Sequence, residues 1–211
     1  MRLIDKIKKF KIIPVAIIES VENAIPLGNA LIEAELPIVE ITFRTDAAEE
    51  SIRILKKEIP DLILGAGTVL TTNQIQRARS AGAEFIVSPG FNPKIVDTCI
   101  QNEIPIFPGI DSPSFIEWGL ERGLNIFKLF PADLSGGPAF LKALSGPYQD
   151  VNFIPTGGVN NNNLIEYLKL RNVIACGGSW IVPKDLISSK NFLEITKRIK
   201  QALALIQKEL K

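Results

Sequence analysis

Eight short apolar runs, rich in β-branched residues, are the feature of this 211-residue sequence that most restricts its fold. They recur about every 20–25 residues with helix-like stretches between them, which is the alternation of βαβ units in a parallel sheet. The runs are IIPVAII (12–18), PIVEITF (37–43), LILGAGT (62–68), EFIVSP (84–89), IPIFPG (104–109), IFKLFP (126–131), NFIPTGG (152–158) and VIACGGS (173–179). The clearest helical patterns span 47–59, 73–83, 92–103 and 113–123, and the expected N-cap residues are Thr72, Asn92, Ser112 and Asn163.

The number and spacing of these units favour a closed barrel over an open doubly wound sheet. No G-x-G-x-x-G fingerprint follows the first run, which argues against a dinucleotide-binding fold. The composition is 46% hydrophobic but only 7% aromatic, so the core must be built mainly from the Ile, Leu, Val and Ala of a buried parallel sheet. We therefore expect one α/β domain over residues 1–211, a single (β/α)8 TIM barrel with an extra N-terminal helix near 2–10 and a C-terminal helix over 191–210.

Charge and hydropathy exclude several classes of partner. The net charge is +1 and charged residues make up 22%, so no strong field favours nucleic acid or an anionic membrane. No apolar run approaches the roughly 20 residues that span a bilayer. The N-terminus MRLIDKIKKFKIIP is interrupted by charges and is not a signal peptide. We expect a soluble, cytoplasmic protein that binds neither nucleic acid nor membrane.

The sequence contains no histidine, which removes Ser-His-Asp and Cys-His catalysis and His-ligated metals. Its two cysteines, Cys99 and Cys176, match no zinc or redox spacing and are expected to pack as reduced thiols. No acidic cluster has the spacing of metal ligands, so we expect neither a metal nor a cofactor. Acid–base chemistry must therefore fall to carboxylates, lysine, tyrosine or water.

Lys128 is the sharpest chemical signal. It lies in the otherwise apolar run Ile-Phe-Lys-Leu-Phe-Pro, where alternation places it on one face with Ile126 and Phe130. An ammonium group among apolar walls loses hydration, which favours the neutral amine that Schiff-base chemistry requires. The structural alternatives are a lysine paired with a carboxylate or one that extends from the strand end into solvent.

Glu40 is likewise a charged residue within an apolar run, the second one. Alternation places it on one face with Thr42 and Arg44. A carboxylate inside a barrel mouth is costly unless it is paired or hydrogen-bonded. A structural ion pair with Lys128 or Arg44 is one interpretation. A Lys–Glu pair in one cavity is also what an aldolase needs, since the carboxylate can shuttle protons for the amine.

Several residues at the ends of other runs could bind an anionic substrate. Arg44 could clamp an anion with its bidentate guanidinium, or it could be a solvated surface arginine. The run Gly65–Thr68 offers close backbone approach and the Thr68 hydroxyl. Thr156-Gly157-Gly158 and Gly177-Gly178-Ser179 end the last two runs, where such barrels frequently bind phosphate through backbone N–H groups. Ordinary turn glycines are the alternative at these two positions.

Taken together, these motifs resemble the bacterial 2-keto-3-deoxy-6-phosphogluconate (KDPG) and 4-hydroxy-2-oxoglutarate (KHG) aldolase family, which consists of class I pyruvate aldolases. The similar stretches occur in the family's order and extend from about residue 10 to residue 185: Val39–Arg44, Gly65–Val69, Ser88–Gly90, Phe127–Pro131, Pro155–Gly158 and Gly177–Trp180. The resemblance implies reversible, metal-independent cleavage of a keto acid into pyruvate and an aldehyde, which would be glyceraldehyde 3-phosphate or glyoxylate. It also implies a homotrimer.

The resemblance assigns a role to each matching residue. It implies that Lys128 forms the Schiff base and that Glu40 is the general acid/base. The remaining residues would bind substrate: Arg44 and Thr68 the pyruvate carboxylate, Pro89 and Phe130 the walls of its pocket, and Thr156, Gly157, Gly158, Gly178 and Ser179 the distal phosphate. One departure is the loop Asp111–Phe115, where relatives usually carry small or hydroxyl residues and then a glutamate. A phosphosugar isomerase or epimerase, or a non-catalytic barrel that binds phosphorylated ligands, remains the alternative, because a fold does not fix function.

Overall fold

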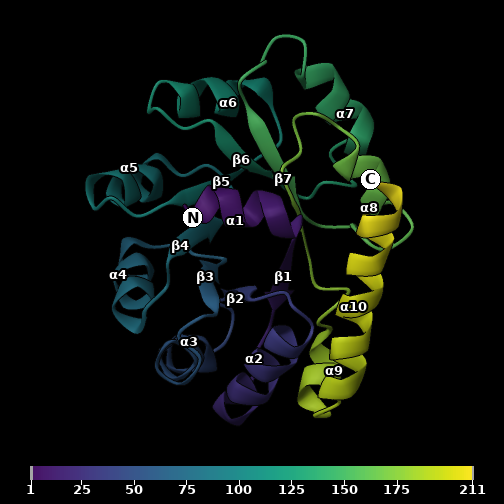
Figure 1. The fold of residues 1–211 in the computed structure, drawn as a ribbon. Helices are drawn as coiled ribbons and strands as arrows, with labels where there is room; N and C mark the ends of the chain where they lie inside the picture. The colour runs from purple at the N-terminus through teal and green to yellow at the C-terminus, as the bar shows by residue number, and fades with distance from the viewer. Residues whose placement is uncertain (1, 211) are drawn as a thin grey trace.

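Eight parallel strands alternate with helices in the computed structural model, which describes residues 2–210 (Figure 1). The strands are β1 (Ile12–Ala16), β2 (Ile38–Thr42), β3 (Ile63–Gly67), β4 (Phe85–Ser88), β5 (Ile106–Ile110), β6 (Ile126–Leu129), β7 (Asn152–Pro155) and β8 (Cys176–Gly178). Each lies within one of the eight apolar runs, so the strand assignments are confirmed, except that β5 extends one residue past its run.

The strands form a barrel in which consecutive strands from β1 to β7 are hydrogen-bonded to each other and β8 is hydrogen-bonded to β1, in the order β7-β6-β5-β4-β3-β2-β1-β8. Isolated bridges from Phe153 to Val173 and from Thr156 to Gly177 join the two ends of this order. The expected (β/α)8 barrel is therefore confirmed. Because all strands run in parallel, their C-terminal ends meet at one mouth, where barrels of this kind place their chemistry.

Helices surround the barrel and cover the end opposite its mouth. They are α1 (Leu3–Phe10), α2 (Ala24–Glu33), α3 (Ala47–Glu58), α4 (Thr72–Ala81), α5 (Pro93–Gln101), α6 (Pro113–Leu120), α7 (Gly137–Leu144), α8 (Leu164–Leu168), α9 (Lys184–Ser188) and α10 (Phe192–Glu209). Since α1 ends just before β1 begins, it lies at the N-terminal ends of the strands, and Figure 1 shows it crossing the ring of strands. The long α10 packs beside α2, where the Thr196 hydroxyl donates to the Ala30 carbonyl.

The alternation of each strand divides its side chains between two environments. In β6, Phe127 and Leu129 are fully buried among the core residues between strands and helices. Lys128, between them, faces the other way, into the barrel, and so does Glu40 of β2. Burial of the apolar faces holds the barrel together, so the interior positions are free to carry chemistry.

The helix N-termini differ in detail from the sequence expectation. The cap of α4 is Thr71 and not Thr72: its hydroxyl accepts from the Gln74 N–H while the Gln74 side chain accepts from the Thr71 N–H. Asn92 caps α5 as expected. Ser112 and Asn163 stand at the expected positions, but neither side chain caps its helix. A sequence pattern places a helix start only to within a residue or two, because several neighbouring polar residues can act as the cap.

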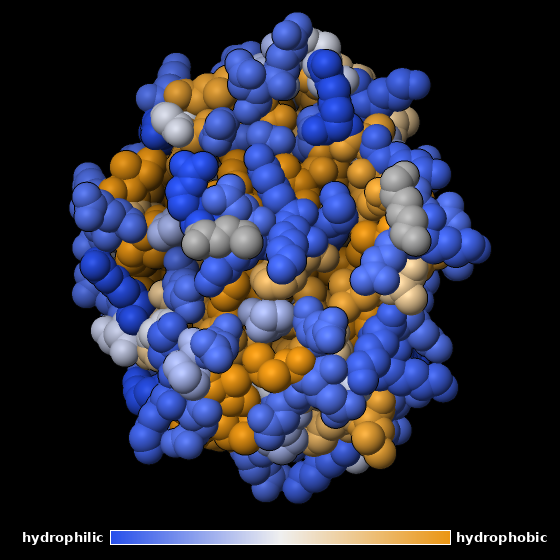
Figure 2. Space-filling view, in the orientation of Figure 1, coloured by the Kyte–Doolittle hydropathy of each residue, from blue (hydrophilic) through white to orange (hydrophobic). Residues whose placement is uncertain are grey.

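The face seen in Figure 1 is mostly hydrophilic, with apolar side chains visible in furrows between the helices (Figure 2). No helix within residues 2–210 combines the length and the apolar character needed to cross a membrane.

Candidate active site

Lys128 and Glu40 meet inside the barrel. The lysine Nζ lies 3.6 Å from Oε1 of Glu40, and only 6% and 3% of the two residues are exposed. The distance is that of an ion pair but exceeds a hydrogen bond, and Oε1 has no hydrogen-bond partner among the described residues. A buried carboxylate oxygen without a donor is costly in a purely structural pair, which favours a functional interpretation.

The neighbouring strand leaves little room around this carboxylate. Gly67 of β3 pairs with Thr42 of β2, and a Cβ placed on Gly67 would overlap the Glu40 side chain. Position 67 therefore requires a glycine, because the Glu40 side chain occupies the space that a Cβ would fill. The Phe130 ring also lies near the amine, with its centroid 5.1 Å from Nζ of Lys128.

Arg44 and Thr68 are brought together at the ends of β2 and β3. Arg44 Nε donates to the Thr68 hydroxyl at 3.2 Å, so the sequence alternative of an Arg44–Glu40 ion pair is not what the structure shows. Thr68 has a backbone φ of 55°, an uncommon conformation for a β-branched residue, which is typical of constrained functional sites. The pair thus presents a guanidinium and a hydroxyl at the barrel mouth.

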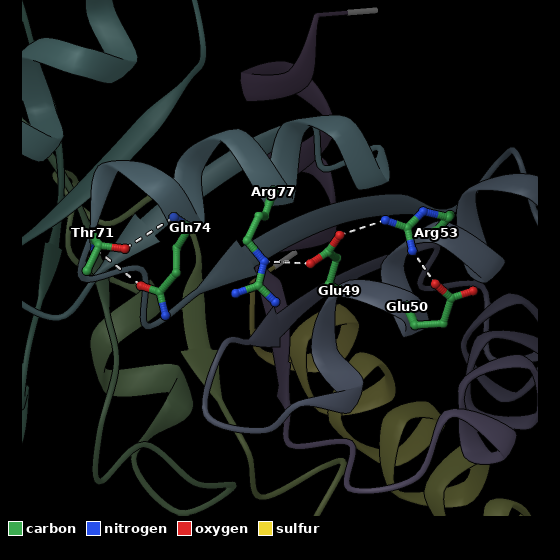
Figure 3. Close-up of polar contacts among 6 residues, drawn as sticks. All are labelled: Glu49, Glu50, Arg53, Thr71, Gln74 and Arg77. Carbon is green, nitrogen blue, oxygen red and sulfur yellow. Dashed lines mark hydrogen bonds and ion pairs between the residues drawn. The ribbon is translucent and has the colours of Figure 1, made fainter.

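Contacts in the helix layer hold these two strand ends in place (Figure 3). The Gln74 side chain accepts from the N–H groups of Leu70 and Thr71, which fixes the loop that begins with Thr68. Arg77 of α4 pairs with Glu49 of α3 at 2.6 Å, and its guanidinium lies over the ring of Phe43, the residue before Arg44. This ion pair between α3 and α4 fixes the loop after β2 relative to the loop after β3.

A cavity of about 120 Å³ opens at the mouth and collects most of the predicted binding residues. It is lined by Val15, Ile17, Arg44, Phe130, Thr156, Gly157, Gly158, Val159, Gly178 and Ser179. Within residues 2–210, the backbone N–H groups of Gly158, Val159 and Ser179 donate to no protein acceptor, whereas the bridge from Thr156 to Gly177 engages the Gly157 N–H. Three free N–H groups around one cavity form an arrangement that can bind an anion.

Several predicted residues do not line this cavity: Lys128, Glu40, Thr68, Pro89 and the loop Asp111–Phe115. Pro89 lines a separate depression beside Leu70 and Phe91, although its carbonyl packs against Gly109, which pairs with Lys128. Asp111 is exposed at the end of β5 and does not line the cavity. The assignment of Pro89 to a pocket wall therefore stays a prediction, as does any influence of the Asp111–Phe115 loop.

Three residues that line the cavity were not predicted from the sequence. Val15 and Ile17 come from the end of β1, and Val159 follows the two glycines in the loop after β7. Apolar residues at strand ends resemble core residues in sequence. The register that places them at the mouth was the only signal that could have identified them.

The cysteines and possible metal ligands stand apart from this site. Cys99 and Cys176 are buried free thiols. Burial raises the pKa of Cys99 to about 12 and raises the pKa of Cys176 as well. In the part of the chain that the structure describes, no three His, Cys, Asp or Glu side chains gather as a metal site would require. Metal independence itself stays a prediction.

Comparison with known proteins decides the family. The model of the KDPG and KHG aldolase family matches residues 3–198. The chain belongs to this family. It is therefore an aldolase, a carbon–carbon lyase, as the sequence motifs predicted.

Relatives of this aldolase are similar over nearly their whole length. The 2-dehydro-3-deoxy-phosphogluconate aldolase of Treponema pallidum is 46% identical, over 97% of both chains. The KHG/KDPG aldolase of Escherichia coli K12 is 38% identical, over 91% of this chain and 90% of its own. The KDPG aldolase of Legionella pneumophila, solved with pyruvate captured at low pH as a covalent carbinolamine, superposes with a TM-score of 0.92 at 40% identity, over 96% of this chain and 98% of its own.

A second solved structure holds a phosphorylated ligand. The 2-keto-3-deoxy-6-phosphogluconate aldolase of Zymomonas mobilis ZM4, determined with 3-phosphoglycerate, has a TM-score of 0.87 and 35% identity. The match covers 96% of this aldolase and 95% of the Zymomonas mobilis chain.

Proposed function

We propose that this aldolase reversibly cleaves KDPG into pyruvate and glyceraldehyde 3-phosphate, and KHG into pyruvate and glyoxylate, through a Schiff base on Lys128. The observation that carries the proposal is the buried pair of Lys128 and Glu40, with the carboxylate oxygen Oε1 lacking a hydrogen-bond donor within the described chain. The carbinolamine in the Legionella pneumophila relative supports the same covalent chemistry.

In the proposed mechanism, the neutral amine of Lys128 attacks C2 of the keto acid and forms a carbinolamine. The carboxyl group of Glu40 donates a proton to the departing hydroxyl, water leaves, and an iminium remains. Glu40 then takes the proton of the C4 hydroxyl, directly or through water, as the C3–C4 bond breaks and the aldehyde departs. The electron pair of that bond moves into an enamine, which accepts a proton at C3, and water releases pyruvate.

The two ends of the substrate have separate sites in this proposal. Arg44 and Thr68 hold the pyruvate carboxylate, because the guanidinium supplies charge and the hydroxyl lies 3.2 Å from its Nε. The distal phosphate lies beside Gly157 and binds the free N–H groups of Gly158 and Ser179. These groups are neutral, so phosphate recognition would depend on hydrogen-bond geometry more than on net charge.

Trapping with borohydride tests the proposal. Incubation with pyruvate and borohydride should inactivate the enzyme and leave one pyruvate-derived adduct on the peptide that contains Lys128. Lys128→Arg is the sharper control than Lys128→Met, because arginine keeps a cation beside Glu40 but cannot form an imine. It should give no adduct and no turnover. An adduct on another lysine would contradict the assignment, and absence of any adduct would favour an isomerase, an epimerase or a binding protein.

The remaining features of the proposal concern the whole molecule. We propose that residues 1–211 form one domain that works in the cytoplasm, in the Entner–Doudoroff route of sugar-acid catabolism, without metal or cofactor. We further propose a homotrimer, as the membership of the KDPG and KHG aldolase family suggests. Sedimentation equilibrium would test the trimer, and full activity after exhaustive chelation would test the absence of a metal requirement.

A further inference from the structure

A hydrogen bond joins the loops that follow β7 and β8. The indole Nε1 of Trp180 donates to Oδ1 of Asn161 at 2.8 Å. Asn161 lies in the run Asn160–Asn163, which comes shortly after Gly157 and Gly158 in the loop that follows β7, and Trp180 directly follows Ser179. The bond therefore connects the two backbone segments whose free N–H groups line the cavity.

The Trp180 ring also fixes the backbone of its own loop. A Cβ placed on Gly178 would overlap carbon atoms of the six-membered ring, so the indole lies directly against the Gly178 backbone. Arg198 of α10 donates to the Trp180 carbonyl at 3.4 Å, and the Trp180 side chain is half-buried. The position of Trp180 thus sets the position of Gly178 and Ser179.

The other loop is fixed by the asparagines on either side of Asn161. The side-chain amides of Asn160 and Asn163 both donate to the Gly158 carbonyl, at 3.1 and 3.0 Å. A trans peptide directs its C=O and N–H to opposite sides, so this contact turns the Val159 N–H away from the two amides. Val159 lines the cavity, and within residues 2–210 its N–H donates to no protein acceptor.

We propose that Asn161 and Trp180 are positioning residues that lock the two anion-binding loops into one receptor, and that they thereby set the enzyme's preference for a phosphorylated over an unphosphorylated keto acid. This inference rests on the proposed phosphate site. N–H donors from two loops bind one anion well only if their relative positions are fixed before binding, because ordering a loop on binding costs affinity. Neither side chain needs to touch the substrate.

A double-mutant cycle tests the inference. Asn161→Ala removes the acceptor from an exposed side chain and should not affect folding. Trp180→Phe keeps a ring against Gly178 but removes the N–H donor. The matched control is Asn162→Ala, since the Asn162 side chain is exposed and makes no hydrogen bond within residues 2–210. The measurements are kcat and KM for KDPG and for KHG, and the inhibition constant of inorganic phosphate.

Each single variant should raise the KM for KDPG and the inhibition constant of phosphate by about 3- to 10-fold, the effect of one neutral hydrogen bond. The kcat and the KM for KHG should stay unchanged. The double variant should be no worse than the more impaired single variant, because both remove the same bond. A general folding defect would instead affect both substrates.

Two other outcomes would overturn the inference. If phosphate inhibits the wild-type enzyme but Asn161→Ala behaves as Asn162→Ala does, the positioning role fails while the proposed phosphate site survives. If phosphate does not inhibit the wild-type enzyme competitively, the phosphate site itself fails, and the inference fails with it.

Discussion

The Nζ atom of Lys128 lies 3.6 Å from Oε1 of Glu40, although their strands stand on opposite sides of the barrel. β6 and β2 are separated by three strands in either direction around the closed sheet. The two side chains meet because both point inward and an eight-stranded barrel is only wide enough for side chains to fill it. Since the contact is too long for a hydrogen bond, both groups remain available to a substrate.

Replacing the carboxylate tests the proton-transfer role of Glu40. Glu40→Gln keeps the shape of the side chain but cannot accept a proton, so kcat should fall about 10²- to 10⁴-fold. Borohydride trapping of pyruvate should slow as well. Glu84→Gln is the control, because that carboxylate pairs with Lys56 just before β4, at the other end of the barrel. A Glu40→Gln enzyme with near-normal turnover would remove Glu40 from the mechanism.

Gly67 tests whether the exact placement of that carboxylate matters. In Gly67→Ala, the new Cβ would overlap the Glu40 side chain and displace it. A misplacement of about 1 Å can cost on the order of 100-fold in rate, so we expect a loss of this size in kcat. At Gly90, a Cβ would meet no atom within 4 Å among residues 2–210, so Gly90→Ala is the matched control. Equal effects of the two substitutions would contradict the prediction.

The phosphate site is best tested at Ser179. Ser179→Ala removes one hydroxyl donor from an exposed residue and should raise the KM for KDPG about 10-fold or more, because a hydrogen bond to a charged group contributes about 1.5–3 kcal/mol. The KM for KHG should change little. Gly158→Val is less informative, since Gly158 has a φ of 87° and a Cβ there would overlap Asp133, so strain would affect both substrates. Equal losses on both substrates in Ser179→Ala would remove Ser179 from phosphate binding.

The thiols should be inert in the folded protein. Burial raises the pKa of Cys99 to about 12 and also raises that of Cys176, so thiolate is scarce at neutral pH. We expect no fast reaction with a thiol reagent at a pH of about 8 and two reactive thiols after denaturation. Rapid labelling of either cysteine in the native enzyme would show that its helix or strand opens readily.

Glu49 should stabilise the protein only above acidic pH. Hydrogen bonds from Arg77 and Arg53 lower the pKa of Glu49 below its ordinary value of 4.5. The folded state therefore binds this proton less tightly than the unfolded state, and the stabilisation is present above pH 4.5 and lost as pH falls through the lowered pKa. Glu49→Gln should lower the free energy of unfolding at neutral pH by about 0.5–1 kcal/mol. The effect is small because Arg53 and Arg77 are half-exposed, so solvent weakens both ion pairs. Urea unfolding at neutral pH and at a pH of about 3 should show this difference disappearing in acid.

Much of the architecture could be predicted from local patterns. Evenly spaced β-branched runs specify strands, and their period of two separates Lys128 and Glu40 from the apolar side chains on either side of them, which is the division that the barrel shows. The absence of histidine limited the chemistry, and glycines after the last two strands indicated an anion site. These features depend only on neighbouring residues and on composition, so the sequence states them directly.

Other features depend on contacts between distant residues. Arg44 could have paired with Glu40, and only the close packing of β2 against β3 made Thr68 its partner. Pro89 matches the family motif, yet it lines a separate depression, because the path of the loop after β4 decides where its ring lies. The link from Asn161 to Trp180 joins residues 19 positions apart. Strand patterns and motifs are local, whereas barrel closure and loop paths decide which side chains meet, and only the tertiary structure sets those.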